Sequence, residues 1–252
     1  MTNTDLAGKN ALVCGASQGI GLAAARALAA RGAAVTVISR SEPPSEDRFA
    51  FLRADLQQIE NLIPTLEKQL QVPPTFHILV NNSGGPPPGP IMDATIEQFL
   101  AAFRQQLLAS HLLMQWLLPT MKTLGYGRII NVISTSVREP IPGLGVSNTI
   151  RGAMSSWAKT LSREVGKFNI TVNNVLPGAT RTARLESIIA RKSAQSGTPR
   201  EEIEAQIRSE IPLGRFAEPA ELGAVIAFLA SPAASYISGV SIPVDGGRLH
   251  CV

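Results

Sequence analysis

Short runs rich in β-branched residues alternate along the chain with longer segments of helical periodicity. The strand-like runs occupy residues 10–15, 34–39, 49–56, 77–82, 127–134, 170–176 and 240–247. The helical segments occupy residues 20–32, 59–70, 96–121, 147–165 and 219–231, with two more within 183–210. Apolar strands joined by helical crossovers are typical of a parallel sheet that is covered on both faces. The alternation therefore predicts an α/β fold with a doubly wound parallel sheet of about seven strands.

The composition agrees with one soluble globular domain over residues 1–252. Hydrophobic residues make up 44% of the 252 residues and charged residues 17%, which is typical of a globular chain. This length suffices for one large domain with a filled core. We find neither a linker nor a repeat that would divide it.

Charge and cysteine patterns exclude several classes of protein. Cys14 and Cys251 stand at opposite ends of the chain, with neither a disulfide framework nor a metal-binding spacing, so we expect no metal and a reducing, cytoplasmic compartment. The net charge of +4 comes from scattered Lys and Arg residues, unlike a nucleic-acid footprint. The start of the chain lacks the pattern of a secretory signal, and no run reaches the roughly 18 apolar residues of a membrane span. We expect a small-molecule substrate, with neither nucleic acid nor membrane as partner.

A glycine-rich segment, CGASQGIG, follows the first strand and opens the first helix. Gly15, Gly19 and Gly21 are spaced G-x-x-x-G-x-G. Glycines let the backbone turn tightly and approach a pyrophosphate, which the amino terminus of a helix attracts. The position between strand and helix is the context that a dinucleotide site requires.

This spacing resembles the T-G-x-x-x-G-I-G motif of the short-chain dehydrogenase/reductase family, with Cys14 in place of threonine. The resemblance extends along the whole chain, through the motifs ADL, VNNSGG and PGATRT and through residues 211–247. It implies a single-domain Rossmann-type fold, a nicotinamide cofactor and a homotetramer or homodimer, with the helices at 96–121 and 147–165 at the interface.

The resemblance also implies a set of cofactor-binding residues. Asp55 takes the position that contacts adenine, and Thr182 the position that holds the nicotinamide carboxamide. The complete set is Gly15, Ser17, Gly19, Ile20, Gly21, Arg40, Asp55, Asn82, Gly84, Arg151, Pro177, Gly178, Thr180 and Thr182.

The end of the second strand favours NADP(H) over NAD(H). An NAD-preferring site places Asp or Glu there to bind the ribose hydroxyls, whereas this chain has Ser39 followed by Arg40. An arginine can bind a 2′-phosphate through charge-assisted hydrogen bonds, and Ser17 can add a hydroxyl. The alternative is that Arg40 is an ordinary solvent-facing arginine.

The catalytic positions of the family are occupied by unusual residues. The family uses a serine, a tyrosine, a lysine four residues after the tyrosine, and an asparagine that helps to hold a proton-relay water. The matching positions are Ser134, Ser147, Arg151 and Gln106. The tyrosines of the chain, Tyr126 and Tyr236, stand at positions that do not suit catalysis.

These substitutions leave two hypotheses open. A serine hydroxyl is a much weaker acid than tyrosine, and an arginine stays protonated. Arg151 can still bind ribose and stabilise a developing alkoxide while water delivers the proton, which suits quinones or enolisable dicarbonyls. One hypothesis is therefore an NADP(H)-dependent reductase of a carbonyl compound, similar to oxoacyl-carrier-protein reductases. The other is a non-catalytic NADP(H)-binding sensor or partner subunit.

Two loops are expected over the site. The proline-rich segment 84–93 follows the fourth strand and either shapes the pocket or forms a rigid surface turn. By resemblance, residues 183–212 form a substrate lid, and Arg181, Arg184, Arg191 and Lys192 lie at its start. These cations either attract an anionic substrate or belong to a solvated helix face, and the solvated face is the favoured interpretation.

Overall fold

Parallel strands form the centre of the molecule. The computed structural model describes residues 4–70 and 75–251, so the first residues of the segment tested for a secretory signal lie outside it. Within these ranges, seven strands form one parallel sheet in the order β3-β2-β1-β4-β5-β6-β7. The strands are β1 (Asn10–Cys14), β2 (Ala34–Ser39), β3 (Ala50–Arg53), β4 (Ile78–Asn81), β5 (Gly127–Val132), β6 (Ile170–Pro177) and β7 (Ser241–Val244). The predicted doubly wound α/β fold is confirmed.

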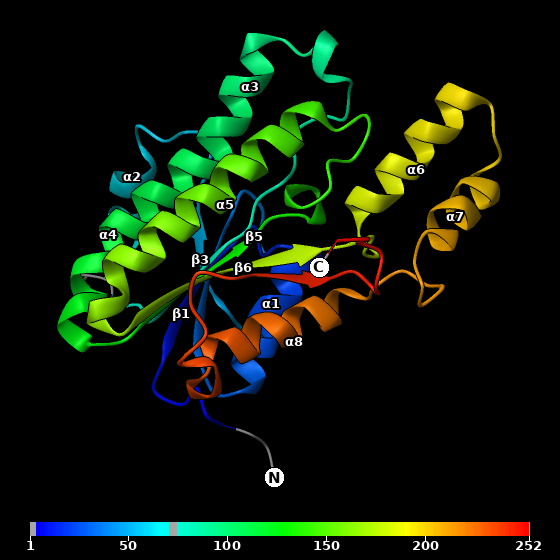
Figure 1. Cartoon of the computed structure of the whole chain (residues 1–252). Helices are drawn as coiled ribbons and strands as arrows, with labels where there is room; N and C mark the ends of the chain where they lie inside the picture. The colour runs from blue at the N-terminus through cyan, green and yellow to red at the C-terminus, as the bar shows by residue number, and fades with distance from the viewer. Residues whose placement is uncertain (1–3, 71–74, 252) are drawn as a thin grey trace.

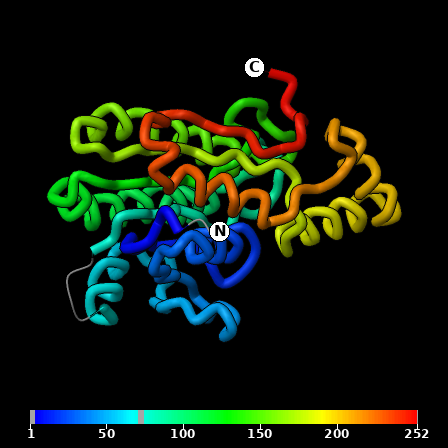
Figure 2. Tube along the Cα trace, turned by 90° about the horizontal axis from the view of Figure 1, so that it is seen from below, coloured from blue at the N-terminus to red at the C-terminus, as the bar shows by residue number. Residues whose placement is uncertain are grey.

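Helices cover both faces of this sheet (Figure 1). Their bounds are α1 (Gly19–Ala30), α2 (Leu62–Leu70), α3 (Ile96–Ala102), α4 (Ala109–Leu124), α5 (Gly145–Val165), α6 (Ala183–Ser196), α7 (Arg200–Ser209) and α8 (Pro219–Ala230). Helices α1 and α8 pack on one face, and α2, α4 and α5 on the other. Helices α6 and α7 lie beyond the carboxyl ends of the strands and outside the two helical layers (Figure 1 and Figure 2).

Alternation along each strand divides the core into two layers. In β1, Ala11 and Val13 pack toward α1 and α8, whereas Leu12 and Cys14 pack toward α4 and α5. Successive side chains of a strand point to opposite faces, so a strand buried on both faces reads as a continuous apolar run. This periodicity explains why the strands are recognisable in the sequence.

The prediction of one long helix over residues 96–121 is wrong for the middle of that range. A π-helical segment, η3 (Phe103–Leu108), separates α3 from α4. It carries Gln106, which is buried. Apolar periodicity predicts a helix over the whole segment and does not locate one π-turn within it, because the i→i+5 hydrogen bonds are confined to a few residues. The third strand is also shorter than predicted, because residues 54–56 leave the sheet to line a cavity.

A row of hydrogen-bonded side chains crosses the sheet from the last residue of β4 to the first residue of β7. The Nδ2 of Asn81 donates to Oδ1 of Asn131, and the Nδ2 of Asn131 donates to Oδ1 of Asn174, both over 2.9 Å. The Nδ2 of Asn174 donates to the hydroxyl oxygen of Ser241 over 3.0 Å. Strand register places these four residues side by side on β4, β5, β6 and β7.

We predict that Asn131→Ala lowers the free energy of unfolding by about 2–6 kcal/mol. The substitution leaves a buried donor on Asn81 and a buried acceptor on Asn174 without partners, and each unsatisfied group costs about 1–3 kcal/mol. Urea unfolding measures the loss, with the exposed Asn61→Ala as the matched control. A loss no larger than that of the control would show that the amide row does not stabilise the sheet.

Candidate active site

A cavity of about 1100 Å³ opens at the carboxyl ends of the strands. Residues that follow β1 to β6 line it, as expected for a ligand site in a doubly wound sheet. It brings together most of the residues singled out in the sequence: Gly15, Ser17, Gly19, Ile20, Arg40, Asp55, Asn82, Gly84, Ser134, Ser147, Arg151, Pro177, Gly178, Thr180 and Thr182. Gly21 and Gln106 lie outside its lining.

The glycine turn is held tightly against the end of β4. Gly15 and Gly19 have φ values of 60° and 59°, in the left-handed region that favours glycine. The Nδ2 of Asn82 donates to the carbonyl oxygens of Cys14 and Gly15, over 3.2 and 3.1 Å. A Cβ at Gly21 would lie 2.3 Å from the carbonyl oxygen of Gly15. Gly21 therefore permits close contact between turn and helix, although it does not face the cavity.

Polar residues lie at both ends of the cavity. Arg40 is exposed at its rim, and within the described ranges its guanidinium makes neither a hydrogen bond nor an ion pair. The Oδ1 of Asp55 accepts from the backbone N–H of Gln57 over 2.9 Å. Thr182 caps α6 by accepting from the N–H of Leu185. Thr180 is buried and donates to the carbonyl oxygen of Gly178 over 3.0 Å.

Three of the four residues at the expected catalytic positions share one wall of this cavity. Ser134 follows β5, and its Oγ accepts from the N–H of Ser136 over 3.0 Å, so the hydroxyl proton is free to be donated to a ligand. Ser147 and Arg151 lie one turn apart on α5. The Nη1 of Arg151 donates to the carbonyl oxygens of Val132, over 3.0 Å, and Ile133.

Arg151 is a partly buried cation. Burial, followed by the like charge of Arg184, lowers the pKa of the Arg151 guanidinium to about 10. The group therefore still carries its charge at neutral pH. Its two carbonyl acceptors hold it in place before any ligand arrives.

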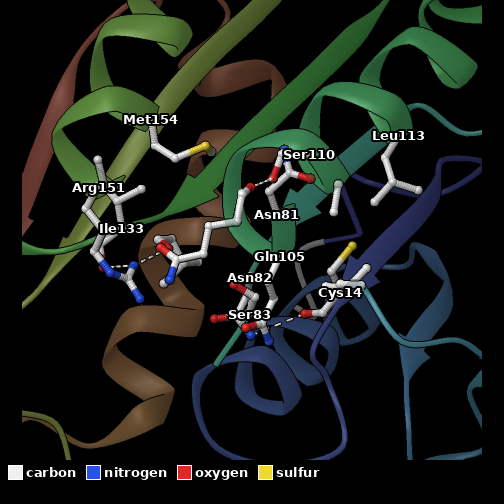
Figure 3. Close-up of a pocket in the computed structure, with 14 residues that line it drawn as sticks. Cys14, Asn81, Asn82, Ser83, Gln105, Ser110, Leu113, Ile133, Arg151 and Met154 are labelled. Carbon is white, nitrogen blue, oxygen red and sulfur yellow. Dashed lines mark hydrogen bonds between the residues drawn. The ribbon is translucent and has the colours of Figure 1, made fainter. Parts of the chain in front are cut away.

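The fourth residue, Gln106, lines a smaller cavity of about 20 Å³ that shares Arg151 and Asn82 with the larger one. Figure 3 shows Arg151 on one side of this space and Asn82, Ser83 and Cys14 on the other. Within the described part of the chain, Nε2 of Gln106 and Oδ1 of Asn81 are buried without hydrogen-bond partners. The volume is enough for one water molecule, which both groups could bind.

Comparison with known proteins gives the same family over nearly the whole chain. The sequence profile described as Enoyl-(Acyl carrier protein) reductase matches residues 15–248. The chain belongs to the short-chain dehydrogenase/reductase family.

Several characterised members of the family are similar to this chain. NADPH-dependent reductase BacG of Bacillus subtilis is 30% identical, over 97% of this chain and 99% of its own. Diacetyl reductase [(S)-acetoin forming] of Staphylococcus aureus is 30% identical, over 98% of each chain. The crystal structure of L-sorbose reductase from Gluconobacter frateurii, complexed with NADPH and L-sorbose, superposes with a TM-score of 0.91 at 29% identity, over 99% of this chain and 100% of its own.

Both tyrosines of this short-chain dehydrogenase/reductase lie outside the cavity, as their sequence positions indicated. The hydroxyl of Tyr126 donates to the carbonyl oxygen of Ala230 over 2.9 Å, near the amino-terminal end of β5. Tyr236 is fully exposed to solvent. Neither side chain reaches the wall that carries Ser134 and Arg151.

Sequence reasoning missed part of the cavity wall of this short-chain dehydrogenase/reductase. Residues 141–144 and Arg248 line it, although no motif marks them. The cations grouped at 181–192 separate in space: Arg181 pairs with Glu218 over 3.1 Å outside the cavity, whereas Arg184, Arg191 and Lys192 line it. Arg191 and Lys192 are also exposed to solvent, so both interpretations remain open for them, whereas Arg184 is partly buried. Arg181 precedes α6 and Arg184 lies in its first turn. Their separation depends on the direction in which α6 leaves the sheet, which the sequence does not give.

Two further properties concern residues 4–70 and 75–251 only. No helix there is both long and apolar enough to cross a bilayer. No group of three or more His, Cys, Asp and Glu side chains is arranged to hold a metal ion.

We predict that native alkylation distinguishes the two cysteines. Burial raises the pKa of the Cys14 thiol to about 12, and the side chain is enclosed, whereas Cys251 is exposed. Because the thiolate is the nucleophile, iodoacetamide at mildly alkaline pH should modify Cys251 alone, and both residues in urea. Mass spectrometry of the peptides measures this. Equal native rates at the two residues would contradict the enclosed glycine turn.

Proposed function

We propose that this chain is an NADPH-dependent oxidoreductase that reduces a carbonyl group of a small molecule. The observation that carries the proposal is one continuous cavity that joins the glycine turn and Arg40 to Ser134, Ser147 and Arg151. The relatives that are NADPH-dependent reductases, and the structure complexed with NADPH and L-sorbose, support it.

The residues of the cavity fit an extended dinucleotide phosphate. The glycine turn and the amino terminus of α1 suit a pyrophosphate, and the unpaired Arg40, with Ser17 in the same cavity lining, suits a 2′-phosphate. Ile20, Asp55, Asn82 and Gly84 would enclose the adenosine half. Pro177, Gly178, Thr180, Thr182 and Arg151 would hold the nicotinamide half. When bound, NADPH supplies the hydride.

Ser134 and Ser147 would orient the substrate carbonyl. The backbone N–H of Ser136 already occupies a lone pair of the Ser134 oxygen, which directs the remaining O–H toward the cavity. Ser147 stands where the family has tyrosine and would bind the substrate or a water by hydrogen bonding. Neither hydroxyl is acidic enough to supply the proton itself at neutral pH.

Arg151 would take over the electrostatic role at the lysine position. As hydride reaches the carbonyl carbon, the oxygen gains negative charge, and a fixed cation stabilises that charge without reorganising. Its anchoring to the carbonyl oxygens of Val132 and Ile133 supplies this rigidity. The free N–H groups of the guanidinium can bind the ribose hydroxyls as well.

The proton would come from water in the small cavity. Gln106 offers an unused buried N–H there, and Arg151 forms part of the same wall. The alkoxide takes a proton from this water, and the resulting hydroxide is neutralised by exchange with solvent. This route suits substrates whose reduced form is a weak base, such as quinones and enolisable dicarbonyls.

Assembly and closure would complete the site. We propose that α6 and α7, within residues 183–212, act as a substrate lid, and that the chain forms a homotetramer or homodimer through α4 and α5. Ile96 and Leu100, which are 72% and 54% exposed on the neighbouring α3, support an interface on this side. The proposed compartment is the cytoplasm.

Arg40→Ala should weaken NADPH binding by about 10- to 100-fold, because the hydrogen bonds lost are to a charged phosphate, and should leave NADH binding unchanged. Calorimetry with both cofactors measures this. Arg26→Gln is the control, because Arg26 pairs with Asp47 away from the cavity. Equal losses for NADPH and NADH would mean that Arg40 does not bind the 2′-phosphate.

NADPH oxidation across a panel of quinones, diketones, oxoesters and aldehydes tests the activity. With the best substrate, we expect Arg151→Met to lower kcat by about 100- to 1000-fold and Ser134→Ala by about 100-fold, as for other fixed donors to a developing oxyanion. Lys159→Met is the matched control, because Lys159 lies on the same helix and contacts the carbonyl oxygen of Gly239. Wild-type kcat should fall as the pH rises through about 10, where Arg151 loses its charge.

The non-catalytic hypothesis makes the opposite prediction for the same assay. Ser147 and Arg151, in place of tyrosine and lysine, are the features that favour it. If the chain is non-catalytic, it binds NADPH, and no member of the panel oxidises the bound NADPH. Arg151→Met then changes only the affinity for the cofactor. That result would replace the reductase by a sensor or a partner subunit.

A further inference from the structure

The large cavity has many more cations than anions. Its lining includes Arg40, Arg151, Arg184, Arg191, Lys192 and Arg248. Among the described residues, its only acidic side chains are Asp55 and Glu210. Glu210 is already paired with Arg248 over 2.7 Å, and Asp55 lies at the opposite end, beyond the glycine turn. Arg151 and Arg184 therefore have no carboxylate partner in the cavity.

Arg184 reaches across the cavity from the lid. It belongs to the first turn of α6, and its Nη2 donates to the carbonyl oxygen of Pro86, over 2.7 Å, in the loop after β4. A Cβ at Gly85 would lie 3.2 Å from the same nitrogen, so this glycine admits the guanidinium. The guanidinium is thus held between the lid and the proline-rich loop, with its other N–H groups unused by the described residues.

This placement does not stabilise the helix. A cation in the first turn of a helix opposes the helix dipole, and Arg184 also raises the local positive potential at Arg151. Two neighbouring, partly buried guanidinium groups without a counter-ion are unfavourable unless a ligand supplies negative charge. A carboxylate matches the planar, forked geometry of a guanidinium.

We propose that the substrate is a carbonyl compound that also carries a carboxylate, and that Arg184 binds this carboxylate when the lid is over the cavity. The proposal rests on the proposed reductase function and names its substrate class. The carboxylate lies against Arg184, and the carbonyl to be reduced lies toward Ser134 and Arg151. Arg191 and Lys192, which are exposed at the same margin, attract the anion to the cavity.

A phosphate of the cofactor is the other possible anion for Arg184, and the experiment separates the two. Binding is measured by calorimetry on the protein saturated with NADP⁺, so no turnover is needed. The probes are matched unreactive acids and amides of increasing length: benzoate and benzamide, phenylacetate and phenylacetamide, 3-phenylpropionate and 3-phenylpropionamide.

We expect at least one acid to bind about tenfold or more tightly than its amide, as a charge-assisted contact requires. Arg184→Gln should bring this ratio close to one and leave NADP⁺ affinity within about twofold. Arg184→Lys should restore part of the ratio. Arg181→Gln is the matched control on the same segment, because Arg181 pairs with Glu218 outside the cavity, and it should keep the wild-type ratio.

Two results would overturn the proposal. The first is that no acid binds more tightly than its amide to the NADP⁺-saturated protein. The second is that Arg184→Gln weakens NADP⁺ binding while the acid-to-amide ratio stays as in wild type, which would assign Arg184 to the cofactor. The reductase function fails separately, if NADPH binds and no carbonyl compound oxidises it, whatever the acids do.

If turnover is found, the carboxylate preference must also appear in the kinetics. Benzoylformate and its methyl ester carry the same ketone, and the ester replaces the charged carboxylate by an uncharged group. We expect kcat/KM for the acid to exceed that for the ester by about tenfold, and Arg184→Gln to remove the difference mainly through KM. A preference for the ester in wild type would count against the proposal.

Discussion

All strands of the described sheet run in the same direction, so their carboxyl ends lie together along one edge of the sheet. The position of the site depends on this parallel arrangement. The central strands β1, β4, β5 and β6 are buried on both faces, which leaves their ends and the loops after them as the places where polar groups reach solvent. The large cavity is lined from the ends of β1 to β6 for this reason. The amide row from Asn81 to Asn174 ties β4, β5 and β6 together.

Charge is the second constraint on the site. The backbone around the glycine turn can stabilise a pyrophosphate without any side-chain charge, so the arginines need another explanation. Arg40 is exposed and far along the sheet, as a 2′-phosphate contact would be. Arg151 and Arg184 are close enough for one to lower the pKa of the other. A cofactor phosphate at one end and a substrate carboxylate at the other would balance these separate groups.

The strand and helix pattern was predictable because it rests on local periodicity and on burial on two faces. Most of the site was predictable as well, since residues that directly follow strands must lie at the shared edge: Ser134 after β5, Asn82 after β4, and Gly15 after β1. The π-turn around Gln106 was not, because its hydrogen bonds involve only a few residues within a segment that the apolar pattern already predicts as a helix. Nor was the separation of Arg181 from Arg184, which depends on the direction in which α6 leaves the sheet.

The sequence by itself determined the parallel α/β fold, the glycine turn and the spacing of Ser147 and Arg151, one helical turn apart. These are properties of residue type and of spacing along the chain. Only the tertiary structure decided that Arg151 is anchored to two carbonyl oxygens of the chain at the end of β5 and that Arg184 reaches Pro86 across the cavity. Those contacts join residues that are distant in sequence. The partners of these arginines, and the pKa of Arg151, therefore depend on how distant segments pack together.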